Sequence, residues 1–208
     1  MGRFPAHRGH ASPGACQTGL VAVSDDPRPG ELLVSTSGQD AGFFDQAVVL
    51  LLDNDENGAI GVALNKPSTT PVSHVLPAWA DQLNPPSVLF AGGPVTPNGA
   101  ICLAKVLDRG EEPPGWRPVV GDVGLLHLDT PVEIVSGAYS DVRVFAGYSG
   151  WEPGQLEGEL ERGVWVRSTP REEDIFGTSS EGLWRRVLRR LGGESALLSA
   201  YTVDPSLN

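Results

Sequence analysis

The chain has 208 residues, of which 40% are apolar and 20% charged, and its formal net charge is −11. This length suits one domain, and the acidity opposes binding to a phosphate backbone or to an anionic membrane surface. No stretch approaches the roughly 20 consecutive apolar residues of a membrane span, so the composition predicts a globular protein of the cytoplasm.

The first 29 residues differ from the rest of the chain. Residues 1–29 are rich in Pro, Gly, His and Arg and show little periodicity, which predicts a disordered extension in front of a domain of residues 30–208. The longest early apolar run, residues 19–23, is too short for the core of a signal peptide. Neither an export segment nor a second domain is therefore expected.

The extension holds three side chains of metal-ligand types close together in sequence. His7, His10 and Cys16 could bind a metal, but a disordered segment would not fix their geometry. Cys16 and Cys102 have no CxxC spacing, so we expect two free thiols in a reducing compartment. No metal and no cofactor is predicted.

Strands are expected through most of the domain. Runs rich in Val, Ile and Leu predict strands at residues 31–35, 47–52, 59–64, 88–91, 100–106, 123–128 and 142–146. The run 47–52 is continuously apolar, as in a central strand buried on both faces, and the polar turn 53–58 leads from it into the next strand as a hairpin. A short helix is expected from Thr70 to Pro77, and residues 107–118 are predicted as a loop.

Helices are expected late in the chain. A helix is predicted over residues 153–161, followed by a strand at 163–167. Two capping boxes follow, at 169–172 and 178–181, and the second begins a strongly amphipathic helix that ends at Gly192 and Gly193. Because strands come early and helices late, we predict a compact single α/β (α+β) domain with a mixed sheet and helices packed on it.

One turn has the start of a calcium-binding loop. Asp53, Asp55, Asn57 and Gly58 match the first ligand positions and the glycine of such a loop. Its twelfth position, which needs a bidentate Glu, is Leu64, and the flanking segments are predicted strands. We interpret the segment as a polar hairpin turn.

A second segment has some features of a nucleophile elbow. Residues 147–151, Gly-Tyr-Ser-Gly-Trp, follow a predicted strand and precede a helix, which would place Ser149 on a tight turn. Trp151 stands where the motif needs a glycine, and no His follows Ser149, so a structural turn is the favoured interpretation. A hydrolase or transferase remains an alternative, using Ser149, His127, Asp129 or Glu157.

The amphipathic helix carries a basic face formed by Arg185, Arg186, Arg189 and Arg190. These side chains could bind nucleic acid, but the acidity of the chain favours a solvated face that pairs with the carboxylates of residues 152–161. Nucleic acid is therefore an unfavoured partner.

Several motifs together resemble the AlgH/YqgE family of small bacterial proteins. They are residues 30–33 (GELL), 58–67 (GAIGVALNKP), 92–95 (GGPV), 147–157 (GYSGWEPGQLE), 163–165 (GVW) and 174–176 (DIF), with Leu183-Trp184 and Leu191-Gly192. The family often has Ala where Ser149 stands, which weakens that serine as a nucleophile. The resemblance implies a compact α/β domain with a mixed, barrel-like sheet, described as a transcriptional regulator, with no accepted enzymatic activity or cofactor.

The sequence thus predicts a non-enzymatic regulatory or adaptor protein that binds a protein or a small ligand. Strand-end loops are where α/β proteins place their binding sites. The candidate binding residues at predicted turns are Asn65, Pro67, Gly92, Gly93, Pro94, Tyr148, Trp151 and Gln155. The competing interpretation is structural, with Gly and Pro forming turns, Trp151 filling the core and Gln155 capping backbone.

Overall fold

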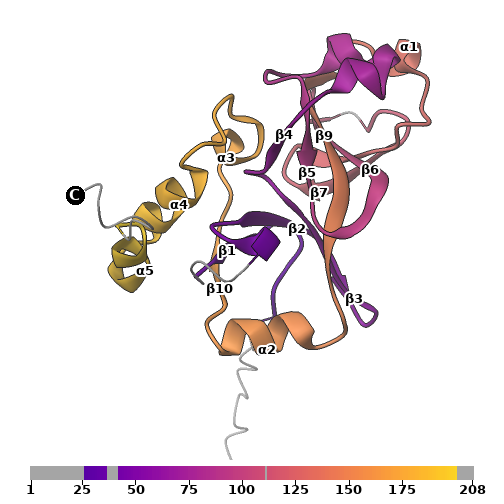
Figure 1. The fold of residues 1–208 in the computed structure, drawn as a ribbon. Coiled ribbons are helices and arrows are strands. Elements are labelled where there is room, and N and C mark those ends of the chain that lie inside the picture. The colour runs from indigo at the N-terminus through magenta and orange to yellow at the C-terminus, as the bar shows by residue number, and fades with distance from the viewer. Residues whose placement is uncertain (1–25, 37–41, 111, 201–208) are drawn as a thin grey trace, which may run out of the picture.

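The computed structural model describes residues 26–36, 42–110 and 112–200 (Figure 1). Most of the predicted N-terminal extension, with His7, His10 and Cys16, therefore lies outside the described residues.

Within the described residues, a ten-stranded sheet forms the body of the fold (Figure 1). Its strands are β1 (Leu32–Ser35), β2 (Val48–Asp55), β3 (Gly58–Ala63), β4 (Pro67–Pro71), β5 (Val88–Ala91), β6 (Val95–Val106), β7 (Trp116–Val120), β8 (Val123–Leu126), β9 (Tyr139–Trp151) and β10 (Trp165–Ser168). Their order is β10-β1-β2-β3-β9-β6-β8-β7, and β5 joins β4 to β9. Only the β5–β9 pair is parallel, so the predicted mixed sheet is confirmed, and it curls into a half-barrel.

The strand β9 connects the parts of this sheet. It pairs with β3 near Trp151, with β5 at Phe145, and with β6 along most of its length. The prediction of a turn at residues 147–151 is wrong, because β9 continues through them. Gly147 has a φ of 68°, which permits the strand to bend there, and a Cβ on Gly93 would lie 2.1 Å from backbone atoms of Tyr148. The glycines that resemble a turn in sequence instead allow two backbones to cross closely.

The β2–β3 hairpin is confirmed, and its apolar strand is buried on both faces. Val48, Leu50 and Leu52 belong to one core with Phe90 and Phe145, whereas Val49 and Leu51 belong to a second core on the opposite face with Trp151 and Trp165. Because successive side chains of a strand point to opposite faces, a continuous apolar run is what two cores require. The pairing register shifts between Leu51 and Asp53, which is a β-bulge.

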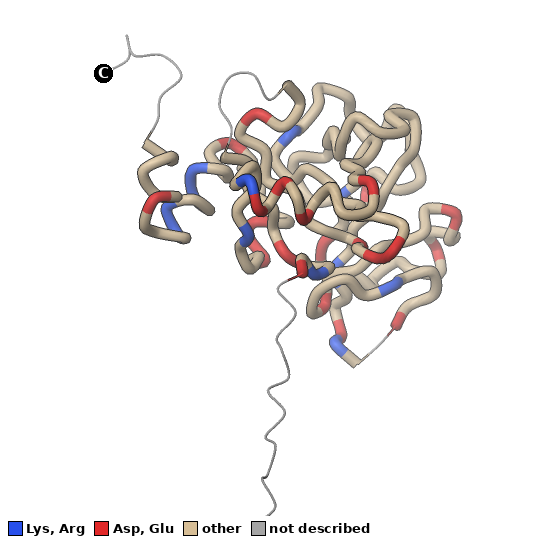
Figure 2. The backbone as a smooth tube through the Cα atoms, turned by 90° about the horizontal axis from the view of Figure 1, so that it is seen from below, with Lys and Arg blue, Asp and Glu red and all other residues tan. Residues whose placement is uncertain are grey.

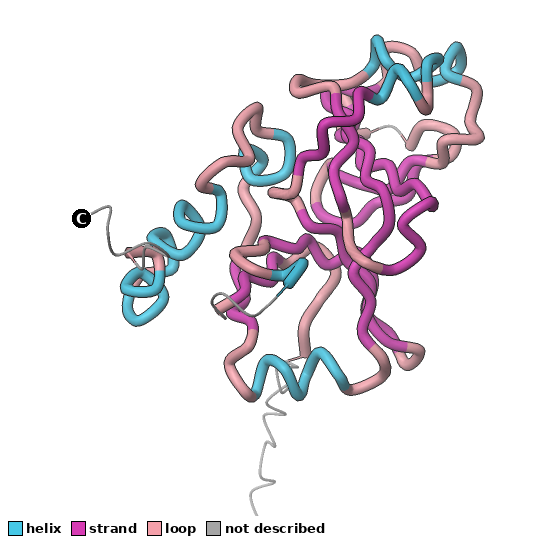
Figure 3. Tube along the Cα trace, in the orientation of Figure 1, coloured by secondary structure: helices cyan, strands magenta, loops and turns pink. Residues whose placement is uncertain are grey.

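The helices lie around the rim of the strands (Figure 3). They are α1 (Val132–Val135), α2 (Gln155–Glu161), α3 (Glu172–Phe176), α4 (Leu183–Leu191) and α5 (Gly193–Leu198), with 3-10 turns η1 (Gly42–Phe44), η2 (Val72–His74) and η3 (Pro77–Gln82). The short helix expected from Thr70 is wrong in its start, because β4 pairs with β5 up to Pro71 and only the two 3-10 turns follow. The loop expected at 107–118 ends in β7, which pairs with β8 despite Pro118.

The first predicted capping box is displaced by two residues, and the second is wrong because α4 has no side-chain cap. The N-cap of α3 is Arg171, whose backbone N–H donates to Asp174 at 2.8 Å, and the Arg190 side chain fixes that carboxylate at 2.7 Å. Gly182, with a φ of 70°, precedes α4 without any side-chain cap. The N-cap of α3 could not be predicted from local sequence, because its Asp174 is held by Arg190 of α4.

The apolar face of α4, including Leu183, Trp184, Val187 and Leu188, packs on the first core. Its arginines are used locally: Arg190 pairs with Asp174, and Arg186 donates to the carbonyls of Ser179 and Glu181. Acidic positions are spread over the body of the fold, and several basic ones gather on the C-terminal helices (Figure 2). None of the helices in the described part of the chain is long and apolar enough to cross a membrane.

Candidate functional site

Three of the predicted binding residues converge on one open cleft. Tyr148, Trp151 and Gln155 line a hollow of about 590 Å³ between the β2–β3 turn, the start of β6 and the junction of β9 with α2. We call it the acidic cleft, because its polar wall includes Asp53, Asp55 and Glu152. Its volume is in the range of ligand sites in proteins.

The acidic cleft combines carboxylates with exposed apolar side chains. No Lys, Arg or His is found among the described residues that line it. Ile60 and Val95 also line it, and they remain 40% and 37% exposed. The cleft therefore offers apolar contact and the negative charges of Asp55 and Glu152 to whatever binds there, whereas Asp53 pairs with Arg117 from outside the lining.

Trp151 and Gln155 build the wall of the cleft rather than reach into it. The indole N–H of Trp151, which is 6% exposed, donates to Glu159 at 2.9 Å, and Trp165 donates to the same carboxylate oxygen at 2.7 Å. Gln155 donates to the other oxygen of Glu159 at 2.9 Å and accepts from the Glu152 N–H at 3.0 Å. These contacts fix the start of α2, so both residues have structural partners.

The other predicted binding residues are divided between two places. Gly92 and Gly93 are buried behind Tyr148, and the exposed Pro94 leads into β6. Asn65 and Pro67 follow the opposite end of β3, away from the Gly58–Ile60 end that lines the cleft.

Asn65 itself has a structural role. Its side chain accepts from the Val48 N–H at 3.0 Å and donates to the Gln46 carbonyl at 2.8 Å. The eight predicted residues thus do not form one site.

The side chains proposed for hydrolase chemistry are not assembled. Ser149 is fully buried, and its hydroxyl donates to the Gly92 carbonyl at 3.0 Å, so it faces no base. His127 and Asp129 line a different cavity, and Glu157 accepts from Asn54 at 3.3 Å. Among the described residues, no group of three or more His, Cys, Asp or Glu side chains could hold a metal ion.

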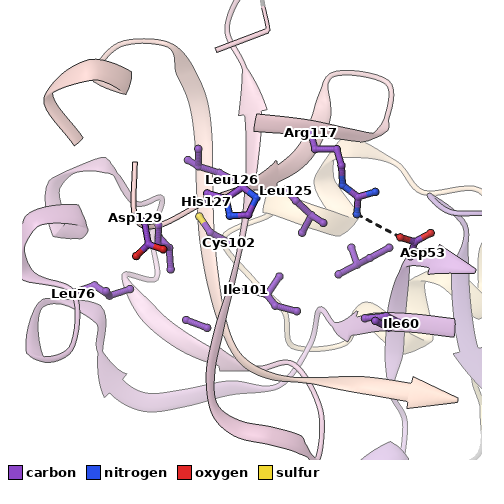
Figure 4. A pocket seen from close by; sticks show the side chains of 13 residues that line it. Asp53, Ile60, Leu76, Ile101, Cys102, Arg117, Leu125, Leu126, His127 and Asp129 are labelled. Atoms are coloured by element: carbon purple, nitrogen blue, oxygen red, sulfur yellow. Dashed lines mark ion pairs between the residues drawn. The ribbon is translucent and has the colours of Figure 1, made fainter. Parts of the chain in front are cut away.

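A second cavity, of about 560 Å³, lies on the other side of Asp53 and Ile60 (Figure 4). We call it the Asp53–Arg117 cavity, after the ion pair at its mouth, where Arg117 Nη2 lies 3.5 Å from Asp53 Oδ2. Cys102 is part of its wall, but burial raises the pKa of this thiol to about 12, so the thiol stays protonated at neutral pH.

Sequence reasoning missed Ile60, Val95 and Arg117, although all three line these two hollows. Ile60 and Val95 look like ordinary strand residues, and only their exposure in the fold distinguishes them. Arg117 lies in a segment predicted as a loop. Arg117 could have been found from sequence only if β7 and its pairing with β8 had been predicted.

Comparison with known proteins shows that the chain matches a known family. An AlgH-like family model, DUF179, matches residues 32–196. A UPF0301 protein of Streptomyces avermitilis is 46% identical over 195 residues, a match that covers 92% of this chain and all of the relative.

Two solved structures share the fold. A protein of Corynebacterium diphtheriae is similar with a TM-score of 0.78 and 26% identity, over 85% of this chain and 94% of that one. The AlgH protein of Pseudomonas aeruginosa is similar with a TM-score of 0.62 and 24% identity, over 84% and 94% of the two chains. At that identity the second likeness concerns the fold alone.

Proposed function

The chain belongs to the AlgH-like family, and from that premise we propose that it is a non-enzymatic adaptor that binds a basic, apolar segment of a partner protein in the acidic cleft. The observation that carries the proposal is the pairing of three carboxylates with two exposed branched side chains and no cation in the described lining. The family name gives no activity, so the proposal depends on this chemistry.

Charge complementarity selects the partner. Asp55 and Glu152 line the cleft at the hairpin turn and after β9, and neither forms an ion pair in the described part of the chain. Lys or Arg side chains of a bound segment would neutralise them, and such contacts raise association rates and specificity. An acidic segment would meet repulsion from the same carboxylates.

The apolar part of the cleft determines how the side chains of a bound segment must be spaced. Ile60 and Val95 come from different strands, and Gly150, which pairs with Ile60 and lies close to Val95, has no side chain to hold a partner's backbone away. A segment that alternates basic with apolar side chains can place one set on the carboxylates and the other on Ile60 and Val95.

The test uses a fluorescein-labelled hexapeptide that alternates arginine with leucine, titrated with the full chain and followed by anisotropy. We expect saturable binding that weakens with added salt. The double variant Asp55→Asn, Glu152→Gln should bind at least about 5-fold more weakly, since it loses two charge contacts.

A matched control separates the cleft from the general acidity of the protein. The double variant Glu133→Gln, Glu194→Gln removes two exposed carboxylates outside the cleft and should bind like wild type. Equal weakening in both double variants, or equal binding of a peptide that alternates glutamate with leucine, would refute the proposal.

A further inference from the structure

The Asp53–Arg117 cavity has one apolar wall and one charged end. Its wall includes Leu52, Ile101 and Leu125, contributed by β2, β6 and β8. Figure 4 shows Arg117 and Asp53 extending toward each other from opposite sides, with Leu125 and Ile101 beside them. His127 and Asp129 line the part of the cavity away from this ion pair (Figure 4).

The ion pair at the mouth is loose compared with others in the same protein. Arg117 and Asp53 meet through one contact at 3.5 Å, with side chains 57% and 47% exposed. Arg190 holds Asp174 through two contacts of 2.7 and 3.2 Å, and Arg167 holds Glu31 through two of 2.8 Å. A strong guanidinium–carboxylate pair is bidentate and about 2.7–2.9 Å long, so Arg117 and Asp53 both keep capacity for another partner.

The conformation of β2 places Asp53 at the cavity. Asp53 stands at the β-bulge of β2, and bulges turn a side chain away from its regular direction, often beside functional sites. Its Oδ1 accepts from the Asn54 N–H at 3.1 Å, which leaves Oδ2 directed at Arg117. The carboxylate is therefore held in place with one oxygen available.

The two opposite charges decide which ligand fits. A fatty acid would satisfy Arg117 but bring its carboxylate against Asp53, and an apolar amine would do the reverse. Either ligand brings like charges together, and such contacts are repulsive. A ligand with both a carboxylate and an ammonium group satisfies both side chains at once.

We propose that the Asp53–Arg117 cavity binds a free α-amino acid with a large apolar side chain. Its carboxylate lies on the guanidinium of Arg117, its ammonium group donates to Asp53, and its side chain packs on Leu52, Ile101 and Leu125. This cavity shares Asp53 and Ile60 with the acidic cleft but differs from it in Arg117, which does not line that cleft.

The test titrates the full chain with L-leucine and L-phenylalanine, by calorimetry and by saturation-transfer NMR for weak binding. We expect at least one of them to bind, and N-acetyl-leucine and leucine amide, each lacking one charge, to bind at least about 10-fold more weakly. L-serine should also bind weakly because it leaves the apolar wall uncovered.

Two variants test whether Arg117 and Asp53 bind the amino acid. Arg117→Gln and Asp53→Asn should each weaken binding at least about 10-fold. The control is Arg109→Gln, since Arg109 forms a similar 3.4 Å pair with Asp122, with its side chain 84% exposed, outside this cavity. Circular dichroism melting verifies that the variants fold.

The proposal is overturned if neither amino acid binds at 10 mM, if the singly charged analogues bind as well, or if Arg109→Gln weakens binding as much as Arg117→Gln. Failure here is distinguishable from failure at the acidic cleft, because the double variant Asp55→Asn, Glu152→Gln changes no residue of this cavity and should bind the amino acid with unchanged affinity.

Discussion

Replacing Glu159 by alanine should destabilise the fold by about 2–4 kcal/mol. The indole N–H groups of Trp151 and Trp165 donate to one oxygen of this carboxylate, and the two tryptophans are only 6% and 3% exposed. An unsatisfied buried donor costs about 1–3 kcal/mol, and water entering beside the half-buried Glu159 recovers part of that for two donors. Urea unfolding followed by far-ultraviolet circular dichroism measures the change.

Two further variants make the reasoning on Glu159 refutable. Glu159→Gln retains an acceptor for the indoles but loses the charge, so we expect a loss of about 1 kcal/mol. Glu161→Ala, an exposed position on the same helix, should change stability by no more than about 0.5 kcal/mol. If Glu159→Ala is as stable as Glu161→Ala, the carboxylate does not hold the two tryptophans.

Three other predictions follow from buried or paired groups. Arg143, 3% exposed, donates to two backbone carbonyls near the end of α3 at 2.6 and 2.9 Å, so Arg143→Met should lower the free energy of unfolding by about 2–4 kcal/mol in urea. Burial raises the pKa of Glu31, but hydrogen bonds from Arg167 and from the backbone outweigh it and hold that pKa below 4.5. A lowered pKa adds stability above pH 4.5 that is lost as pH falls through the folded value, so wild type should lose more stability than Glu31→Gln between pH 7 and pH 3. Since burial raises the thiol pKa of Cys102 to about 12, a Cys16→Ser variant should react with Ellman's reagent at pH 8 only after unfolding.

Each of these three also has a contradicting outcome. Arg143→Met within about 0.5 kcal/mol of wild type would mean that water replaces its two hydrogen bonds. If wild type and Glu31→Gln lose the same stability between pH 7 and pH 3, the Glu31 carboxylate does not contribute to acid destabilisation. Rapid labelling of native Cys16→Ser would show that the cavity wall opens.

The elements defined by local pattern were predictable from sequence. The apolar run 47–52 and the polar turn after it specify the β2–β3 hairpin, and the amphipathic pattern of residues 183–191 specifies α4. Such patterns are set by which face of an element is buried, so they are visible without the fold.

The parts that depend on distant partners were not predictable. Residues 147–151 have the composition of a turn, and only pairing with β3 and β6 makes them a strand. The acidic cleft has the same origin: Tyr148, Trp151 and Gln155 were selected because they follow a predicted strand, whereas Ile60 and Val95 become candidates only when exposure is known. Arg117 enters the second cavity through β7, which contains Pro118 and closely follows Pro113 and Pro114, and prolines disfavour a strand by local rules.

The position of β9 in the chain has a consequence for biosynthesis. Strands β3, β5 and β6 all precede it and all pair with it, so a ribosome must translate past Trp151 before any of them has its full set of neighbours. Until then the apolar segment Val48–Leu52 of the nascent chain lacks Phe145 in one core and Trp151 in the other. More than two thirds of the protein is therefore made before the sheet can close, which favours folding after synthesis over stepwise folding during it, and makes the emerging chain a substrate for chaperones that bind exposed apolar strands.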